Sequence, residues 1–449
     1  MKLWEKDSKT LQNVMDFTIG NDKDYDVLLA PYDIIGSMAH AIMLGETGIM
    51  EKSESKAIIK VLSEYYPIVR KTAFKLNEDE EDIHSHLENY LVNKLGETGK
   101  KIHTGRSRND QVMVSLQLFM KYELQEISQN AGNLAASILV RAKELKDVLL
   151  PGYTHTQVAM PSSVALWLGA YAESLANDLQ FALGAMKNIN QNPLGSAAGF
   201  GSSVPINREL TRDLLNFADL QVSAVSTQLN RGKLEMQMAS GMASVASTLS
   251  RLASDMIFYM GQDLKFISFP DELTTGSSIM PHKKNPDVLE LIRGHCNLIL
   301  QIPASLNSLY TNLISGYHRD FQLCKQVLIP GINQLMQCLE MMQLMVNNMR
   351  VREEILFDEK YKYIFSVEEV NRKVTNGTSF RDAYREIARE IKENAYISSG
   401  DTEYTHTGSI GNPGLSQISE KLQEALQPFD LTSPDNLMNE LRDFYNTLK

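Results

Sequence analysis

Long tracts of this chain contain no proline. None occurs in residues 68–150, 206–269 or 331–412. Proline removes a backbone N–H, and its ring clashes with the preceding turn, so a proline-free tract leaves room for a long helix. With 14 prolines and 26 glycines in 449 residues, the chain has fewer such breaks than average usage would supply.

Apolar residues in the first of these tracts recur at steps of three and four, which is the spacing of one helix face. The stripe runs through Leu124, Ile127, Ala131, Leu134, Ile138, Ala142, Leu145 and Leu149. We therefore predict a helix over 112–149, which at 1.5 Å per residue would be on the order of 55 Å long. Similar tracts predict helices over 162–189, 231–258 and 331–351, and another from 287 to beyond 300.

The fold class predicted from these tracts is an all-α helix bundle. Segments with strand-like alternation are few and short. Apolar residues make up 43% and charged residues 22% of the chain, which fits a globular protein and excludes a disordered or purely coiled-coil one. The predicted helices are longer and more apolar than one core needs. We expect the methionine-rich ones to pack against other helices or other subunits.

The net charge and the cysteine content limit which binding partners and which cellular compartment we expect for this protein. The formal charge of −11 argues against nucleic acid or an anionic membrane as the main partner. Three cysteines without CxxC spacing indicate a reducing compartment. The N-terminal MKLWEKDSKT resembles no secretory signal, and no uninterrupted apolar run approaches the roughly 18 residues of a membrane span. We expect a cytoplasmic enzyme.

The first polar segment that could carry chemistry is KKIHTGRSRNDQ, residues 100–111. Arg106, Arg108 and Asn109 offer forked donors suited to carboxylates, beside a helix N-terminus that favours anions. The alternative is a solvated loop that ends in a helix cap formed by Ser107 or Asn109. The segment alone leaves both readings open.

The second segment is GYTHTQVAMP, residues 152–161, between the first two long helices. His155 lies among Thr154, Thr156 and Gln157, which could fix the imidazole tautomer that an acid or base needs. A purely structural histidine is equally consistent with the sequence.

The third segment is TTGSSIMPHKKNPDVLELIRG, residues 274–294. Its second half is typical of a helix start, with Asn285 as cap, Pro286 in the first helical position and an acid after it. Its first half combines a Gly-Ser-Ser loop with Lys283 and Lys284. Flexibility, hydroxyl groups and ammonium groups together suggest a lid that closes over an anion.

Metal and nucleotide sites have no support in the sequence. His84 and His86 are two apart, so on a helix they would diverge, and no HExxH or CxxC accompanies them. The chain also has no P-loop and no GxGxxG.

The three segments resemble the argininosuccinate lyase family of the fumarase/aspartase superfamily. GSSIMPHKKNPD resembles the superfamily signature, while TGRSRNDQ and GYTHTQ are more similar to argininosuccinate lyases than to their relatives. Together with YHRDFQLCK at residues 317–325, the resemblance extends over most of the chain. It implies helical domains over 1–107, 108–357 and 358–449, with a central five-helix bundle. It also implies a homotetramer with active sites shared between subunits, and neither metal nor organic cofactor.

The implied reaction is the splitting of argininosuccinate into L-arginine and fumarate, a carbon–nitrogen (amidine) lyase step of arginine biosynthesis. Removing a proton next to a carboxylate creates a dianion, which needs preorganised cations and N–H donors. By resemblance Ser277 takes the proton and His155 protonates the leaving nitrogen, with the reverse assignment left open, and Lys283 and Asn285 stabilise the dianion. The residues implied in substrate binding are Arg108, Asn109, Thr154, Asn285, Tyr317, Gln322, Lys325 and His84.

Two departures from the family pattern stand out. His282 replaces the glutamine that usually precedes the two lysines, and the stretch DFTIGNDKD, residues 16–24, has no serine where a substrate-binding one is expected. No residue is therefore assigned to the arginine half of the substrate. Two alternative functions stay open, an adenylosuccinate-type lyase and a catalytically silent scaffold of the same fold.

Overall fold

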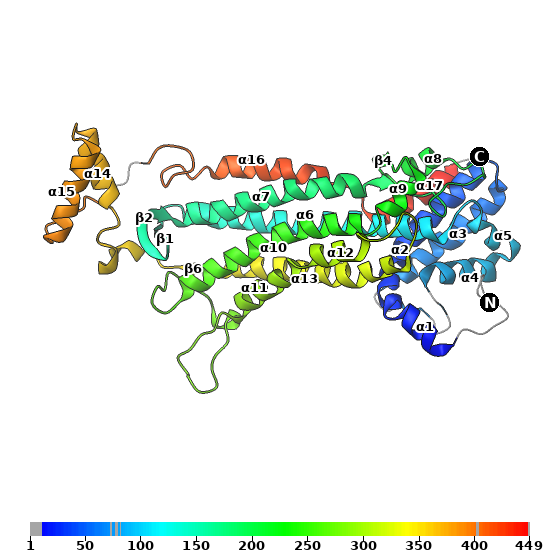
Figure 1. The fold of residues 1–449 in the computed structure, drawn as a ribbon, viewed down its shortest axis with the longest axis horizontal. Coiled ribbons are helices and arrows are strands. Elements are labelled where there is room, and N and C mark those ends of the chain that lie inside the picture. The colour runs from blue at the N-terminus through cyan, green and yellow to red at the C-terminus, as the bar shows by residue number, and fades with distance from the viewer. Residues whose placement is uncertain (1–10, 72–73, 77–79, 81, 401–403, 448–449) are drawn as a thin grey trace.

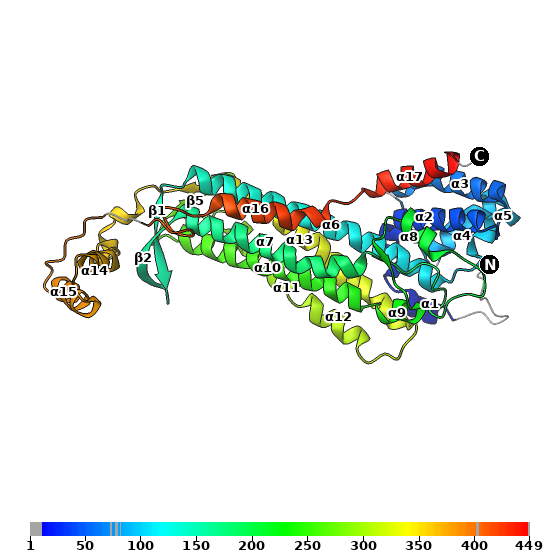
Figure 2. The same ribbon diagram turned by 90° about the horizontal axis from the view of Figure 1, so that it is seen from above.

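The structure is a computed structural model, and it describes residues 11–71, 74–76, 80, 82–400 and 404–447. Within these residues the chain is overwhelmingly helical, and its strands pair only in two-stranded sheets. The predicted all-α fold is confirmed. Figures 1 and 2 show an elongated molecule with a compact group of helices at one end, long parallel helices in the middle and a small helix pair at the other end.

The compact end is formed mainly by the N-terminal helices. They are α1 (Gln12–Ile19), α2 (Asp22–Glu46), α3 (Lys52–Val69), α4 (Ile83–Leu95) and α5 (Glu97–Lys100). Among the described residues, α2 is the one helix long and apolar enough to cross a membrane. Because 89% of its apolar window is buried inside the protein, α2 fits the role of a core helix.

The middle of the molecule is a bundle of long helices. They are α6 (Arg108–Glu144), α7 (Val164–Ile189), α10 (Lys233–Met260), α11 (Asp287–Ile299) and α13 (Leu323–Asn348), with α12 (Ile302–Tyr310) continuing α11. Methionines of the helices predicted over 231–258 and 331–351, such as Met242 and Met342, are fully buried in the common core.

The segment predicted as the end of the first long helix folds differently. α6 ends at Glu144, and residues 149–154 form strand β1 (Leu149–Thr154), which pairs antiparallel with β2 (Gln157–Ser163). The two remaining small sheets pair β3 (Gln191–Asn192) with β4 (Asp219–Leu220) and β5 (Ile267–Ser268) with β6 (Arg350–Val351).

Proline interrupts fewer helices than the sequence suggests. The helix predicted over 331–351 begins earlier, at Leu323, and passes through Pro330. Helices α2 and α3 likewise contain Pro31 and Pro67. Each internal proline costs a backbone hydrogen bond. Packing of the flanking buried residues, such as Leu328 and Ile332 beside Pro330, offsets that loss.

The C-terminal part of the chain contributes helices to both ends of the molecule. α14 (Ser366–Thr375) and α15 (Phe380–Lys392) form the small end around Val370, Ala383 and Ile387. α16 (Leu415–Leu426) returns along the bundle, and α17 (Pro434–Thr447) packs on α2 and α3. The shorter helices α8 (Arg208–Leu214) and α9 (Ala224–Leu229) lie in the connection from α7 to α10. The three-domain division at residues 107 and 357 stays a prediction.

Gly99 sets how closely α5 approaches α4, and through it the position of the segment that leads into α6. A Cβ at this buried glycine would lie 2.5 Å from the backbone carbon and oxygen of Leu91, closer than real contacts allow. We expect Gly99→Ala to destabilise the fold by about 1–3 kcal/mol, the usual cost of overpacking, seen as a lower melting temperature. The control is Gly184→Ala in α7, where nothing lies within 4 Å of a new Cβ. Equal melting temperatures for the two variants would contradict this role of Gly99.

Candidate active site

A cavity of about 310 Å³ lies where α6 and α13 begin, beside the start of α2 and α4. Six of the eleven residues predicted for the site line it: His84, Arg108, Asn109, Tyr317, Gln322 and Lys325. They come from three separate segments of the chain. The fold thus brings together the TGRSRNDQ and YHRDFQLCK segments, as a shared substrate site requires.

Arg108 and Asn109 reach the cavity from the first turn of α6. The Ser107 hydroxyl accepts the N–H of Asn109 at 3.3 Å, and the Asp110 carboxylate accepts the N–H of Ser107 at 2.9 Å, which completes a capping box. The predicted helix cap is confirmed, and the same turn presents Arg108 and Asn109 to the cavity. The helix N-terminus adds a partial positive charge at the cavity wall.

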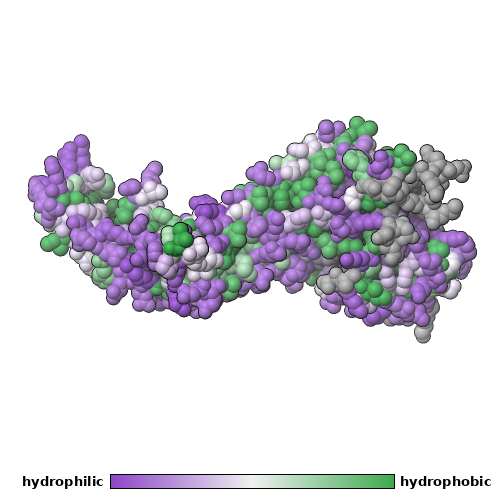
Figure 3. All heavy atoms as spheres, turned by 90° about the horizontal axis from the view of Figure 1, so that it is seen from below, coloured by the Kyte–Doolittle hydropathy of each residue, from purple (hydrophilic) through white to green (hydrophobic). Residues whose placement is uncertain are grey.

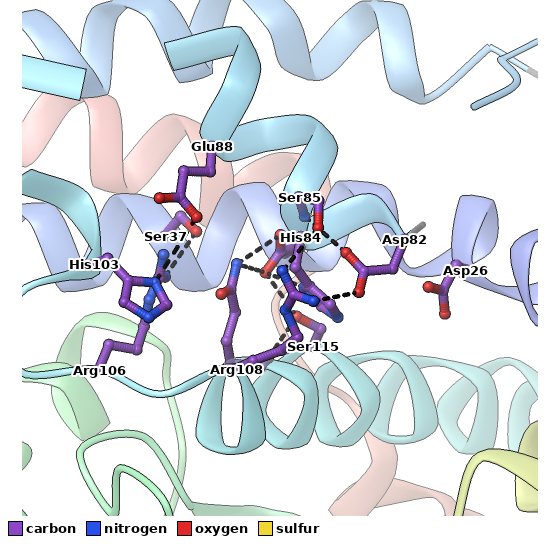
Figure 4. A network of polar contacts seen from close by, with 12 residues as sticks. Asp26, Ser37, Asp82, His84, Ser85, Glu88, His103, Arg106, Arg108 and Ser115 are labelled. Atoms are coloured by element: carbon purple, nitrogen blue, oxygen red, sulfur yellow. Dashed lines mark hydrogen bonds and ion pairs between the residues drawn. The ribbon is translucent and has the colours of Figure 1, made fainter. Parts of the chain in front are cut away.

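The Arg108 guanidinium is held from the side of α4. Its Nη1 lies 3.1 Å from the Asp82 carboxylate, and its Nη2 donates to the Ser85 hydroxyl at 2.7 Å (Figure 4). These two partners fix the direction of the guanidinium while leaving it partly exposed to the cavity. Arg106, also predicted to bind carboxylates, does not line the cavity. It is buried and donates to the Ser37 hydroxyl at 2.9 Å, so its guanidinium lies within the protein core instead.

A buried polar network under the cavity holds His84. The His84 Nδ1 atom lies 3.2 Å from the carboxylate of Asp33, which is fully buried. Gln111 donates to both Asp33 oxygens at 3.0 Å, and Ser115 donates at 3.2 Å. The network joins α2, α4 and α6, the helices that carry much of the cavity wall.

The opposite charges of this network stabilise each other. Burial disfavours a protonated His84, but the Asp33 carboxylate outweighs it and raises the pKa of the imidazole. Burial also disfavours ionised Asp33, but His84 and the Arg106 guanidinium together lower the pKa of that carboxyl. The Asp33 carboxylate thus favours the charged form of His84 at the cavity wall.

The first turn of α13 contributes Lys325 to the cavity wall. Its ammonium group lies 2.8 Å from the Asp22 carboxylate and also pairs with Asp26. Burial disfavours the ammonium, but the two aspartates outweigh it and raise the pKa of Lys325. Gln322 donates to the carbonyls of Thr18 and Ile19 at 3.1 Å and so ties α1 to this wall.

Sequence reasoning missed five charged residues that also line the cavity: Asp22, Asp26, Asp82, Arg231 and Arg319. Asp82 directly precedes the predicted Ile83-His84 pair and could have been found there. The partnership of Lys325 with Asp22 and Asp26 spans 303 and 299 residues, and no local pattern signals it.

Thr154 and His155 lie elsewhere, at the exposed tip of the β1–β2 hairpin. His155 and Thr156 form its two-residue turn with φ of 53° and 59°, as a type I′ turn requires. A β-branched residue in this region is strained, at about 1–2 kcal/mol. The hairpin thus holds His155 out from the end of the bundle at a conformational cost, which is typical of functional positions.

Ser277, Lys283 and Asn285 lie in a third place, the long loop between β5 and α11 that stands away from the bundle in Figure 1. Asn285 closes its base, pairing with Thr275 through the backbone and donating to the Gly276 carbonyl at 3.1 Å. The Ser277 oxygen accepts the N–H groups of Ile279 and Met280 at 3.4 and 3.2 Å. The predicted cap role of Asn285 is not seen, since α11 begins at Asp287 without a side-chain cap.

Neither the hairpin nor the loop lines the cavity. Both emerge from the other end of the bundle, where the Tyr153 ring packs on Phe258 and Phe266 with centroids 5.5 and 6.4 Å away. α6 separates the two ends, since its 37 residues span on the order of 55 Å. One chain therefore keeps this cavity and its predicted acid–base groups apart.

Removing either partner of the Asp33–His84 pair leaves an uncompensated buried polar group. We expect Asp33→Asn and His84→Gln each to cost about 3–5 kcal/mol, and the double variant to cost less than their sum. Urea unfolding of the four proteins measures the coupling energy. The exposed Arg352–Asp358 pair is the control, for which less than about 1 kcal/mol is expected.

The coupling also depends on pH. Because the pKa of His84 is raised, its contribution is complete below the ordinary value of 6.5 and is lost as the pH rises through the folded pKa. Because the pKa of Asp33 is lowered, its contribution is complete above 3.8 and is lost as the pH falls through the folded pKa. The coupling should be greatest between these two values, and a coupling that grows above pH 8 would contradict a protonated His84.

Comparisons with known proteins show which sequences and which fold the chain resembles. A family model described as "Lyase" matches residues 3–300. The argininosuccinate lyase of Bacteroides thetaiotaomicron is 45% identical, covering 96% of each chain, and that of Parabacteroides distasonis is 46% identical, covering 95% of this chain and 96% of its own. Among solved structures, EDDS lyase in complex with formate has a TM-score of 0.70 at 22% identity, covering 98% of this chain and 95% of its own.

Proposed function

The chain belongs to the argininosuccinate lyase family and is a carbon–nitrogen lyase, and we propose that it splits argininosuccinate at a site built from segments of different subunits. The products are L-arginine and fumarate. The observation that carries the shared site is the separation of Arg108 and His155 by the length of α6. A second copy lying antiparallel along the bundle would bring one chain's hairpin and loop to another chain's cavity.

The succinyl half of the substrate binds at the Arg108 side of the cavity. Its two carboxylates meet the Arg108 guanidinium, the Asn109 amide and the N-terminal amides of α6, while protonated His84 adds positive charge. These groups are held before substrate arrives, by Asp82, Ser85 and Asp33. Preorganised donors stabilise charge that develops later without reorganising.

The reaction is a β-elimination. The Ser277 oxygen takes a proton from the succinyl carbon next to a carboxylate, and the extra electron pair moves onto that carboxylate as a dianion. The electron pair of the dianion then forms the C=C bond of fumarate as the C–N bond breaks. The electrons of the C–N bond leave with the guanidino nitrogen, which His155 protonates. Lys283 and Asn285 stabilise the dianion, and Thr154 assists in holding the succinyl group.

Local geometry supports Ser277 as the base. A serine hydroxyl is a weak base unless its ionised form is stabilised. The N–H groups of Ile279 and Met280 already point at the Ser277 oxygen, and hydrogen bonds to a charged form favour that form. The ammonium of Lys283, brought nearer by closure of the loop, adds to this effect.

The surface of the bundle supports a homotetramer. Apolar atoms gather along the long helices in Figure 3, and large apolar side chains stand exposed there, among them Phe181, Leu291, Leu298 and Leu344. Other copies of the chain would cover this face in a tetramer. All three cysteines are buried and unpaired, which supports a reducing, cytoplasmic compartment.

Purified protein should release fumarate from argininosuccinate, followed by absorbance of the conjugated double bond. Ser277→Ala should lower kcat by about 10²–10⁴-fold, the usual contribution of a general base. Ser278→Ala, one residue along the same loop, is the matched control and should keep most of the turnover. A fumarate signal on adenylosuccinate alone would overturn the substrate, and no signal on either substrate would indicate a silent scaffold.

Mixed tetramers test whether sites are shared. Arg108→Gln disables the cavity and His155→Asn disables the hairpin, so each variant alone should be nearly inactive. Co-expressed, they should regain activity, because some sites then combine an intact cavity from one chain with an intact hairpin from another. Arg108→Gln with Asn109→Asp is the control pair, since both changes fall in one segment and no site escapes both. Confirmed mixed tetramers that stay inactive would refute the shared site.

A further inference from the structure

Asp110, in the first turn of α6, is a fully buried carboxylate whose two oxygens serve different parts of the chain. Its Oδ1 atom accepts the N–H of Ser107 and completes the capping box. Its Oδ2 atom accepts the N–H groups of Gly195 and Ala197 at 3.0 and 2.9 Å. These two residues belong to segment 195–201, which lies between β3 and α8. Capping α6 needs only the first oxygen, so the second contact has another consequence.

The backbone of segment 195–201 forms a concave site for an anion. Gly195 has a φ of 85° and Ala197 a φ of 52°, both in the left-handed region. Backbone amides near residues in this conformation converge on one point, and such concavities bind anions. Ala197 is strained there because it carries a Cβ. The anion in this concavity is the Asp110 carboxylate of the same chain.

Asp110 is ionised at the pH of an ordinary assay. Burial raises its pKa to about 6, while the Ser107 N–H, the Arg106 guanidinium and the N–H groups of Ala197 and Gly195 act in the opposite direction. Above that value the side chain is a carboxylate that accepts three backbone hydrogen bonds. Hydrogen bonds to a charged acceptor are stronger than neutral ones, so this junction is rigid.

Segment 195–201 is itself fixed in the core. The hydroxyl groups of Ser196 and Thr227 lie 3.1 Å apart, and both side chains are fully buried. A Cβ at Gly199 would lie 2.8 Å from the Cγ atom of Gln228, so the segment packs closely against α9. Asp110 therefore ties the first turn of α6 to a part of the chain that cannot easily move.

We propose that Asp110 positions Arg108 and Asn109, because its carboxylate joins the first turn of α6 to segment 195–201 and so keeps both side chains directed at the succinyl carboxylates. The inference rests on the proposed function, which assigns these carboxylates to Arg108 and Asn109. Asp110 does not line the cavity, so it acts through the turn and not by touching substrate. Asp82 and Ser85 hold the Arg108 guanidinium, whereas Asp110 holds the backbone that carries it.

Binding of the two halves of the substrate separates a positioning role from general stability. In Asp110→Asn one carboxylate oxygen becomes an NH₂ group, which faces an N–H donor and breaks the junction on that side. We expect calorimetry on the assembled enzyme to show succinate bound about 10-fold more weakly, the level at which outer partners of metal ligands act. L-Arginine should stay within about two-fold, and the KM for argininosuccinate should rise more than kcat falls.

Asp178→Asn is the matched control for the loss of a buried carboxylate. Asp178 is also buried and accepts hydrogen bonds from Ser244 and Thr248, but it lies between α7 and α10 and does not line the cavity. In assembled protein this variant should keep both affinities within about two-fold.

A second variant tests the junction from the other side and serves if Asp110→Asn does not fold. In Gly195→Ala the new Cβ would lie 2.8 Å from the Arg208 Cγ atom, so the amides that bind Asp110 must shift. Succinate should again weaken selectively. Gly201→Ala is the control in the same segment, since its φ of 80° is equally unfavourable for alanine but nothing lies within 4 Å of its Cβ.

The outcomes separate this inference from the proposed function. Unchanged succinate affinity in Asp110→Asn, or in Gly195→Ala if only that variant folds, would overturn the positioning role. Equal weakening of succinate and L-arginine would also overturn it, because a general loss of structure affects both halves. Wild-type protein that binds succinate but releases no fumarate would refute the proposed function and leave the succinate comparison as the test of Asp110. Wild-type protein that binds no succinate would overturn both.

Discussion

The rigidity of one long helix sets the organisation of this protein. α6 begins at the cavity with Arg108 and ends, 37 residues later, next to the hairpin that carries His155. A continuous α-helix of this length does not fold back on itself. The anion-binding groups and the predicted acid–base groups can therefore meet only if different chains lie alongside each other. An elongated bundle with apolar side chains on its surface is suited to that association.

The electrostatics of the cavity depend on what lies beneath it. Asp33 has no exposed surface, and its charge is sustained by His84, Arg106, Gln111 and Ser115 from three helices. In return, Asp33 raises the pKa of His84 at the cavity wall. In the first turn of α13, Lys325 stays charged because two aspartates face it. Buried pairs of this kind contribute little to net stability but fix the direction of the groups involved, which is what an anion site needs.

The segments that would complete the site are built differently. The hairpin tip and the loop between β5 and α11 are exposed and are held mainly by hydrogen bonds within themselves, such as those of Asn285 with Thr275 and Gly276. Few apolar contacts restrain them, so they belong to the part of the fold that opens and closes at least cost. In the proposed mechanism the cavity would hold the substrate, and the hairpin and the loop would exclude water around it.

The sequence by itself determined the long helices and predicted six of the residues that line the cavity. Periodicity of 3.6 and the scarcity of proline are local properties, so they predicted α6, α7, α10, α11 and α13 and only misplaced their ends, as at Leu149 and Pro330. The tertiary structure decided which charged side chains face each other. Arg106 and Arg108 are two residues apart, yet one is buried against Ser37 and the other opens on the cavity, because successive positions around a helix start point in different directions. Likewise, nothing in the sequence joins Asp22 to Lys325, since a pairing across 303 residues arises only when distant helices pack.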